Sequence, residues 1–373
     1  MLKLSAIKRA LKRSSYGLRL RLNRLRGRSF LELNSFFSFE VSGVCNLSCR
    51  ICAYPHKEIG KSVMSTGEFS DLLEQSLDLG YQDIGLTPMT GDIFMDKDIM
   101  SKMDLLEQNP RVKSFWFYTN FILLDEAKIK RLSSMRKLGP AIYISLYGHD
   151  EDMFARITDR PIKQYKRLLE NLNHLADVAE KLPCPIDIGI RTSASFVWKP
   201  EPGNTDESNP LLRALNRLMA TGNCQYSGNI LEYDSWGGLV TQKDLDDLDM
   251  TVVGPSASKT PKVGACALIF DRPTIFPDGR VNACHCHGVD GSLVVGNIHD
   301  HSLKDILSSN NKRFMDLIAN QQQGNFPEAC NQCIFYRSIY RALKKVPTIR
   351  YEEYMEIIHD RATPPANPPT NPK

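Results

Sequence analysis

No uninterrupted apolar run in the sequence approaches the length of a membrane-spanning helix, about 18 residues. We therefore expect a chain that crosses no membrane. No signal peptide precedes the first cysteines, so we also expect a reducing cytoplasm, where the ten cysteines serve as metal ligands or core residues rather than in disulfides. Composition is otherwise ordinary for a globular protein, and 373 residues can form one large domain and a smaller one.

Residues 1–31 contain no acidic side chain. Leucines alternate with the bases of this stretch, giving a basic, amphipathic arm that suits an anionic membrane surface at the inner face of the membrane. Nucleic acid is disfavoured as a partner, because Tyr16 is the only aromatic residue from Lys3 to Arg28. A solvated helix packed across the bottom of a barrel would explain the same pattern. The ten bases are Lys3, Lys8, Arg9, Lys12, Arg13, Arg19, Arg21, Arg24, Arg26 and Arg28.

A fourth cysteine is missing from the first cysteine group. Cys45, Cys49 and Cys52 form a C-x3-C-x2-C pattern directly after an apolar, strand-like run at 37–44. A [4Fe–4S] cube normally takes four cysteines, so three leave one iron open to a substrate or cofactor. The alternatives are a zinc site completed by His56, and structural disulfides, which would need an oxidising compartment.

This cysteine loop resembles that of the radical S-adenosylmethionine (SAM) superfamily. The resemblance implies that Cys45, Cys49 and Cys52 hold a [4Fe–4S] cluster whose open iron binds the amino and carboxylate groups of SAM. It further implies that one electron, supplied by a reductant such as flavodoxin or ferredoxin, cleaves SAM to a 5′-deoxyadenosyl radical. The protein would then be a radical SAM oxidoreductase.

From residue 37 onward, apolar β-branched runs alternate with helical patterns, which indicates an α/β fold with a parallel sheet covered by helices. One helix is expected to begin at a capping box formed by Ser65 and Glu68 and to stop at Gly80. Six strand–helix units match the partial (β/α)6, TIM-like barrel of the superfamily, where chemistry collects at the carboxyl ends of the strands. The expected strands are 37–44, 83–87, 114–118, 141–146, 186–191 and 225–231, and the other expected helices are about 98–108, 124–136, 163–181 and 208–220.

Two segments after predicted strands resemble SAM-binding motifs of the superfamily. Thr90, Gly91 and Asp92 stand in the place of a Gly-Gly-Glu-Pro segment that holds the SAM ammonium, although the acid is Asp and the proline is missing. Thr119 and Asn120 resemble the start of a Thr-Asn-Gly segment. The resemblance implies SAM contacts at all five residues, and an ordinary Gly-Asp turn is the alternative for the first segment.

Two further SAM contacts are implied after the fourth and fifth strands. Ser145 and Arg156 lie in a stretch similar to the S-x-D-G…R segment of the family, where such a pair meets the SAM carboxylate. Tyr147 replaces the usual acidic residue of that segment. Arg191 is a candidate for the SAM ribose or carboxylate, and a surface salt bridge is the alternative.

A second cysteine group lies near the C-terminus. Cys266 and Cys284 flank Gly279 in a C-x12-G-x4-C pattern, and Cys330 and Cys333 follow. The run 277–279 (Pro-Asp-Gly) predicts a hairpin turn that brings Cys266 and Cys284 together in a small β-hairpin and helix domain. This layout resembles the SPASM domain and its shortened relative, the twitch domain, which carry auxiliary [4Fe–4S] clusters. No cysteine follows Cys333, so the twitch form, with one fully ligated cluster, is the better match. Zinc held by the same four cysteines is the alternative.

Cys286 complicates this ligand count. It could replace Cys284 as a ligand, or it could act catalytically as a thiol hydrogen donor. Cys184 and Cys224 are expected to be core residues. The predicted division is a basic arm at 1–36, a radical SAM barrel at 37–250, an auxiliary cluster domain at 251–345, and a C-terminal helix with a proline-rich tail at 346–373.

The substrate is expected to be a small polar molecule. The 36 residues before the barrel are too short and too basic for the domain that grips precursor peptides in many SPASM enzymes. Aromatic residues stand beside carboxylates in Trp198–Asn209 and Glu232–Gly238, which favours a sugar or amino-sugar derivative. The twitch layout resembles that of a radical SAM alcohol dehydrogenase of aminoglycoside biosynthesis, which favours oxidation over epimerisation. A peptide maturase and a non-enzymatic iron–sulfur electron carrier or scaffold are the alternatives.

Overall fold

The computed structural model describes residues 18, 21–26, 28–29, 36–57, 60–86, 89–196, 198, 209–254, 262–340 and 349–362. Most of the predicted basic arm, residues 199–208 of the first aromatic segment and the predicted proline-rich tail lie outside these residues. Within them, no helix has both the length and the apolar composition needed to cross a bilayer.

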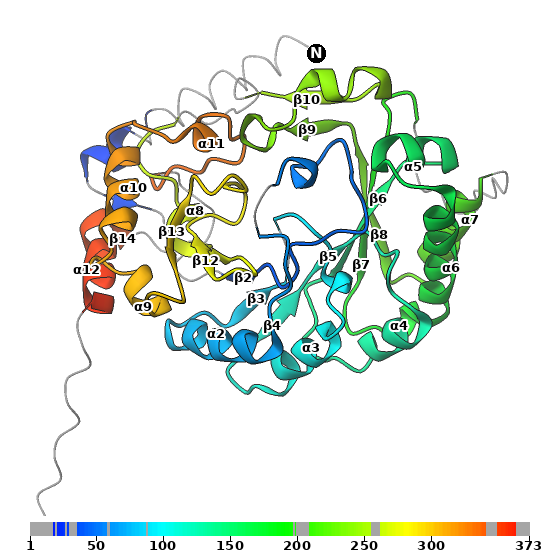
Figure 1. Ribbon diagram of the computed structural model, residues 1–373, viewed down its shortest axis with the longest axis horizontal. Coiled ribbons are helices and arrows are strands. Elements are labelled where there is room, and N and C mark those ends of the chain that lie inside the picture. Colours follow the sequence, from blue (N-terminus) through cyan, green and yellow to red (C-terminus); the bar gives the residue numbers. More distant parts are fainter. Residues whose placement is uncertain are drawn as a thin grey trace, which may run out of the picture.

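A curved parallel sheet forms the larger part of the molecule, with helices on its outer face (Figure 1). Its strands pair in chain order, which confirms the predicted α/β fold of the partial barrel type. Strands β4 and β5 follow each other along the chain and are separated only by Phe117; β4 pairs with β3, and β5 pairs with β6. The strands are β2 (Phe37–Phe39), β3 (Asp83–Gly85), β4 (Ser114–Trp116), β5 (Tyr118–Thr119), β6 (Ile142–Tyr147), β7 (Ile186–Arg191) and β8 (Cys224–Ile230).

The outer helices follow the predicted pattern with two differences. The predicted capping box is confirmed in part, since Ser65 Oγ accepts a hydrogen bond from the Glu68 amide (3.1 Å). The helix predicted at 124–136 is only seven residues long, and Glu151–Thr158 forms a helix, α5, that the sequence did not predict. The helices are α2 (Thr66–Asp78), α3 (Ile99–Gln108), α4 (Glu126–Leu132), α5 (Glu151–Thr158), α6 (Ile162–Val178) and α7 (Pro210–Ala220).

The first strand is shorter than predicted, because the chain changes partner after Phe39. Val41 accepts a hydrogen bond from the Met64 amide (3.0 Å), and Gly43 donates one to Ser62 (2.9 Å). Residues 41–43 therefore lie against the segment that leads into α2 rather than continuing β2. This turn carries the chain into the three-cysteine loop at the carboxyl end of the sheet.

The C-terminal region extends the same sheet. Strand β11 (Thr274–Ile275) pairs parallel to β2 and antiparallel to β12 (Arg280–Asn282), which pairs with β13 (Val294–Asn297). The predicted hairpin turn is confirmed, since Gly279 has a φ of +82° and donates to the Phe276 carbonyl (3.0 Å). The remaining elements are β1 (Arg28–Ser29), β9 (Glu232–Asp234), β10 (Thr251–Val253), β14 (Ile349–Arg350), α8 (Leu268–Asp271), α9 (Leu303–Ile306), α10 (Lys312–Gln322), α11 (Glu328–Asn331), α12 (Tyr351–Ala362) and six short 3-10 turns.

Candidate active site

A cavity of about 600 Å³ lies at the carboxyl ends of the barrel strands. The barrel contributes the cysteine loop and the strand ends, β9 contributes a polar edge, and the C-terminal region contributes residues next to its cysteines. The predicted site residues that line this one space are Cys45, Cys49, Cys52, Thr90, Gly91, Asp92, Thr119, Asn120, Ser145, Arg191 and Cys286.

The three-cysteine loop presents its sulfurs with backbone amides around them. The Leu47 amide donates to Cys45 Sγ and the Tyr54 amide to Cys52 Sγ, both at 3.4 Å. Burial raises the pKa of Cys45 to about 12 and that of Cys52 to about 11, so binding of iron must displace protons from these thiols. His56, the ligand of the zinc alternative, is exposed and does not line the cavity.

The Thr90–Asp92 segment lies directly against the chain that enters the cysteine loop. Gly91 has a φ of +102°, and a Cβ there would lie 2.5 Å from the Ser42 carbonyl, so a larger residue cannot replace it without displacing the backbone. The hydroxyl of Thr90 is buried and has no hydrogen-bond partner within the described part of the chain. An ammonium group of SAM would supply the missing partner, so this cradle fits the ligand that the segment predicts.

Asp92 joins two of the predicted SAM segments. Its Oδ2 accepts hydrogen bonds from Thr119 Oγ1 (2.9 Å) and from the Asn120 amide (2.8 Å). Burial raises the pKa of this carboxyl group, and these hydrogen bonds oppose the shift. Asn120 in turn donates weakly to Cys45 Sγ (3.9 Å), so the Asp92 carboxylate fixes the strand end that reaches the cysteine loop.

The C-terminal cysteines gather behind the far wall of the cavity. Cys266, Cys284, Cys330 and Cys333 are all buried. Burial raises the pKa of Cys330, and the charges of Cys284, Cys266 and Cys333 raise it further, so the Cys330 sulfur lies within electrostatic range of the other three. Amides of Phe335 and Arg337 donate to Cys333 Sγ (3.2 Å) and Cys266 Sγ (3.5 Å). Four thiols with amide donors suit a fully ligated iron–sulfur cluster.

Comparison with known families agrees with both cysteine groups. The model of the radical SAM superfamily matches residues 39–181, and that of the SPASM iron–sulfur cluster-binding domain matches residues 266–334. The chain belongs to the radical SAM superfamily. Its cofactors are therefore SAM and [4Fe–4S] clusters. A comparison with curated proteins found no match.

Several solved structures are similar to this radical SAM enzyme. SuiB of Streptococcus suis bound to precursor peptide SuiA is 13% identical, with a TM-score of 0.51 over 81% of this chain and 69% of that one. BtrN in complex with AdoMet and 2-DOIA is 14% identical (TM-score 0.49, 81% and 93%). anSMEcpe with bound AdoMet is 13% identical (TM-score 0.48, 88% and 93%). The likeness to SuiB shows a shared fold and leaves the substrate open.

Arg156, predicted to meet the SAM carboxylate, lies apart from the other predicted SAM contacts. Arg156 does not line the cavity, and its side chain, 40% exposed, lies 3.7 Å from Asp247 and 3.8 Å from Asp152. The reason is helix α5, which begins at the capping residue Asp150 and carries Arg156 in its last turn toward the 3-10 segment at 246–248. Arg191, at the end of β7, does line the cavity.

Cys286 faces the cavity, whereas Cys284 does not line it. The Cys286 amide donates to Cys284 Sγ (3.3 Å), and the Cys286 sulfur lies 3.4 Å from His285 Nε2. A hydrogen bond from the Cys286 thiol lowers the pKa of Cys284 to about 6. Cys284 is buried like the other three C-terminal cysteines, which agrees with its predicted place among the cluster ligands, whereas Cys286 is in a position to touch substrate.

A buried pair between Asp234 and His287 was not predicted. Asp234 Oδ2 lies 2.8 Å from His287 Nε2 and accepts from the Trp236 amide (2.8 Å). Burial opposes protonation of His287, but hydrogen bonds to Asp234 and Cys333 outweigh it and raise its pKa to about 10. Asp234 lines the cavity, and its Oδ1 is buried without a partner within the described residues. The sequence indicated Asp234 only as part of the segment Glu232–Gly238, and the contact itself could not be predicted because the pair spans 53 residues.

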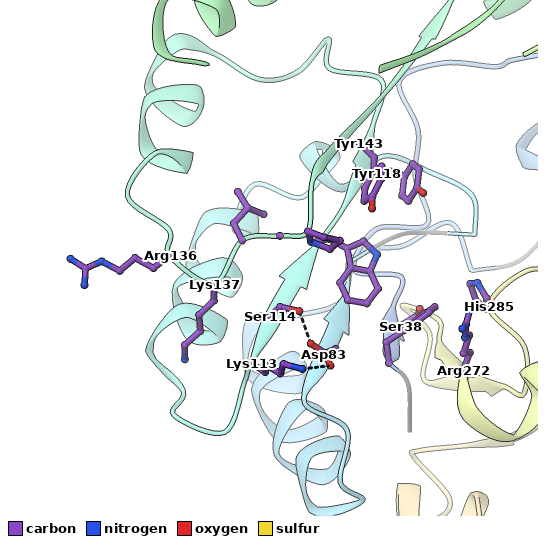
Figure 2. Close-up of a pocket in the computed structure, with 15 residues that line it drawn as sticks. Ser38, Asp83, Lys113, Ser114, Tyr118, Arg136, Lys137, Tyr143, Arg272 and His285 are labelled. Atoms are coloured by element: carbon purple, nitrogen blue, oxygen red, sulfur yellow. Dashed lines mark hydrogen bonds and ion pairs between the residues drawn. The ribbon is translucent and has the colours of Figure 1, made fainter. Parts of the chain in front are cut away.

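A second cavity, of about 740 Å³, lies toward the amino ends of the strands (Figure 2). It shares Tyr118 and His285 with the first cavity. Tyr118 stacks on Tyr143 with ring centroids 4.4 Å apart. Figure 2 shows these two rings next to each other and His285 on another element of the cavity wall. Tyr118 and His285 therefore lie between the two cavities.

Proposed function

We propose that this radical SAM enzyme abstracts a hydrogen atom from a carbon of a small polar substrate, a sugar or amino-sugar derivative, and oxidises that carbon. One observation carries the proposal: the cavity that contains the SAM-binding segments also reaches the residues beside the C-terminal cysteines, among them Cys286 and Phe335. Its volume, about 600 Å³, is typical of small-molecule sites. A substrate in this space would lie between SAM and the auxiliary cluster.

The polar edge of the cavity supports a polyhydroxylated substrate. Glu232 and Asp234 offer carboxylates, and Trp236 and Tyr147 offer aromatic faces. The Trp236 indole N–H donates to the Ile51 carbonyl (3.0 Å), which fixes the ring against the cysteine loop. Of the other predicted aromatic segment, the described Trp198 is buried and packs edge-on against Tyr226, so it belongs to the core.

In the proposed reaction, residues of the cavity bind SAM and the substrate and accept a proton. When bound, SAM and the first cluster supply the hydrogen-atom acceptor, and the auxiliary cluster supplies an electron acceptor. Thr90 would accept a hydrogen bond from the SAM ammonium, and Arg191 would bind the SAM carboxylate or ribose. The free oxygen of Asp234 accepts a hydrogen bond from a substrate hydroxyl and is positioned to take its proton.

Epimerisation is the second candidate function, and the position of Cys286 favours it. A thiol at the cavity wall can return a hydrogen atom to a substrate radical. The two reactions separate on one pair of variants. For a dehydrogenase, Cys330→Ala with Cys333→Ala should permit SAM cleavage but stop oxidised product, and Cys286→Ala should be mild. If Cys286 is essential and solvent deuterium enters the reacting carbon, the enzyme is an epimerase.

SAM cleavage by the reduced protein tests the enzyme class itself. Production of 5′-deoxyadenosine separates an enzyme from an electron carrier or scaffold. Transfer of deuterium from a labelled sugar into that product would identify the substrate, whereas transfer only from a labelled peptide would establish a peptide maturase. We propose a one-electron donor of the flavodoxin or ferredoxin type for the reduction.

We further propose that the basic arm places the enzyme at an anionic membrane surface on the cytoplasmic side. Leu18 and residues 21–25 are helical, and Leu18, Leu22 and Leu25 are 60%, 38% and 83% exposed. Leu22 and Leu25 lie on one face of the helical residues 21–25, and the sequence spacing of Leu18 is that of the same face. Arg21, Arg24 and Arg26 are exposed beside them. An exposed apolar face flanked by arginines suits the headgroup region of a bilayer.

A further inference from the structure

Glu40 and Lys57 form a buried ion pair at the base of the cysteine loop. Their side chains are 0% and 1% exposed, and Lys57 Nζ donates to Glu40 Oε1. Removing two charges from water costs several kcal/mol, so a pair of this kind is weak evidence for a purely stabilising role. Glu40 stands in an otherwise mostly apolar run between β2 and the cysteines. The pair therefore calls for a role beyond fold stability.

The second oxygen of Glu40 reaches the segment that contains the predicted SAM contacts. Glu40 Oε2 accepts a hydrogen bond from the Met89 amide (3.1 Å), and the Thr90 amide also interacts with this carboxylate. Further along, the Asp92 amide donates to the Val44 carbonyl (2.9 Å). The carboxylate and the Val44 carbonyl thus hold the two ends of the segment, with the unpartnered hydroxyl of Thr90 between them.

Lys57 connects the pair to the C-terminal region. Its Nζ lies 5.4 Å from the ring centroid of Phe276, which directly follows strand β11. The surroundings are tight, since a Cβ on Gly43 would lie 3.0 Å from Lys57 Nζ and 3.1 Å from Glu40 Oε1. Lys57 is therefore held in one place and presents a fixed charge to Glu40.

We propose that Glu40 is a positioning residue for SAM: held by Lys57, its carboxylate fixes the Met89–Asp92 segment so that Thr90 can meet the SAM ammonium. The inference rests on the assignment of Thr90–Asp92 to SAM. Loss of the carboxylate frees the start of the segment but leaves the three cysteines in place. Affinity for SAM should fall while the iron content of the protein stays unchanged.

The experiment compares Glu40→Gln with Asp96→Asn. Asp96 forms an equally buried ion pair with Lys102, at 2% and 1% exposure, and its other oxygen accepts from the Asp98 amide (2.8 Å) rather than from the SAM segment. Each substitution replaces one buried carboxylate by an amide. The measurements are iron per chain, the melting temperature, the dissociation constant of labelled SAM, and the electron paramagnetic resonance change that SAM causes in the reduced protein.

We expect Glu40→Gln to raise the dissociation constant of SAM at least tenfold and to weaken the spectral response, with four irons still bound at the first site. The two variants should lower the melting temperature by similar amounts, because each loses one buried ion pair. Asp96→Asn should leave SAM affinity within about twofold of that of the unmodified protein. Equal changes in SAM affinity for the two variants would overturn the positioning role.

Two more variants keep the test decisive. If Glu40→Gln does not fold, Glu40→Asp retains the charge for Lys57 but is too short to reach Met89, and the same loss of affinity is expected. Thr90→Val removes only the unpartnered hydroxyl. Unchanged SAM affinity in Thr90→Val would overturn the assignment of this segment to SAM. If Thr90→Val weakens SAM binding but the Glu40 variants do not, only the positioning role of Glu40 is overturned.

Discussion

Two arginines that were both predicted to contact SAM occupy different environments in the structure. Arg191 lies at the end of a strand that was predicted to the residue, so its side chain reaches the cavity. Arg156 lies in α5, whose capping acids were present in the sequence but were interpreted as part of a SAM-binding stretch. A motif aligned by residue type alone cannot tell a strand end from the far turn of a helix.

Substitution of each arginine by lysine tests this difference. Lysine keeps the charge but loses the planar fork that binds a carboxylate at two points. We expect Arg191→Lys to weaken SAM binding by about 1–3 kcal/mol, and Arg156→Lys to leave it nearly unchanged. Equilibrium binding of labelled SAM to the reconstituted protein measures both. The reverse order would return Arg156 to the site.

Cys286 gives a second prediction at this scale. Cys284 is buried among the other C-terminal thiols and Cys286 faces the cavity, so Cys286→Ala should leave iron per chain unchanged. Cys284→Ala should lose about four irons, one cluster. Iron analysis after anaerobic reconstitution measures both, and Cys184→Ala, a buried core thiol, is the control. If Cys286→Ala loses iron and Cys284→Ala does not, Cys286 rather than Cys284 is the cluster ligand.

Elements whose signals are local were predictable, and elements that depend on distant contacts were not. Ser65 caps α2, and Asp278 with Gly279 turns the hairpin between β11 and β12, because each uses hydrogen bonds within a few residues. The end of β2 depends on pairing with residues 62–64, which no local pattern announces. In the site, the cysteines were evident from spacing, whereas the contacts of Glu40 with Met89 and of Asp234 with His287 join remote segments.

The exposed leucines of the arm yield a prediction at the scale of one helix. The double variant Leu18→Gln, Leu25→Gln should reduce binding to vesicles of phosphatidylglycerol and phosphatidylcholine, because the apolar face is lost while the bases remain. Co-sedimentation at low and physiological salt measures this binding, and each base near the surface adds about 1 kcal/mol at most before screening. SAM cleavage should be unaffected.

Ile162→Gln is the matched control, since Ile162 is also an exposed apolar residue but begins α6, in the barrel part of the chain. It should leave vesicle binding unchanged. If the unmodified protein ignores anionic vesicles at low salt, the arm has a structural role only.

At the scale of the whole molecule, the two cysteine groups should load independently. We expect about eight irons per chain, four for each cluster. Replacing Cys45, Cys49 and Cys52 together by Ala should leave about four irons and abolish SAM cleavage, because the open iron is lost. Iron analysis and chromatography of 5′-deoxyadenosine measure the two effects. Tightly bound zinc without a brown chromophore would contradict both assignments.

The pairing of β11 with β2 has a consequence for how the chain matures. Strand β2 comes almost at the start of the described fold, yet one of its two neighbours is supplied by residues 274–275. Until the hairpin of β11 and β12 has been synthesised, β2 is an unpaired edge strand that can pair with another chain. Such distant pairing also delays folding. A barrel truncated before residue 262 should therefore aggregate, and iron delivered during synthesis would meet a cysteine loop whose supporting strand is still incomplete.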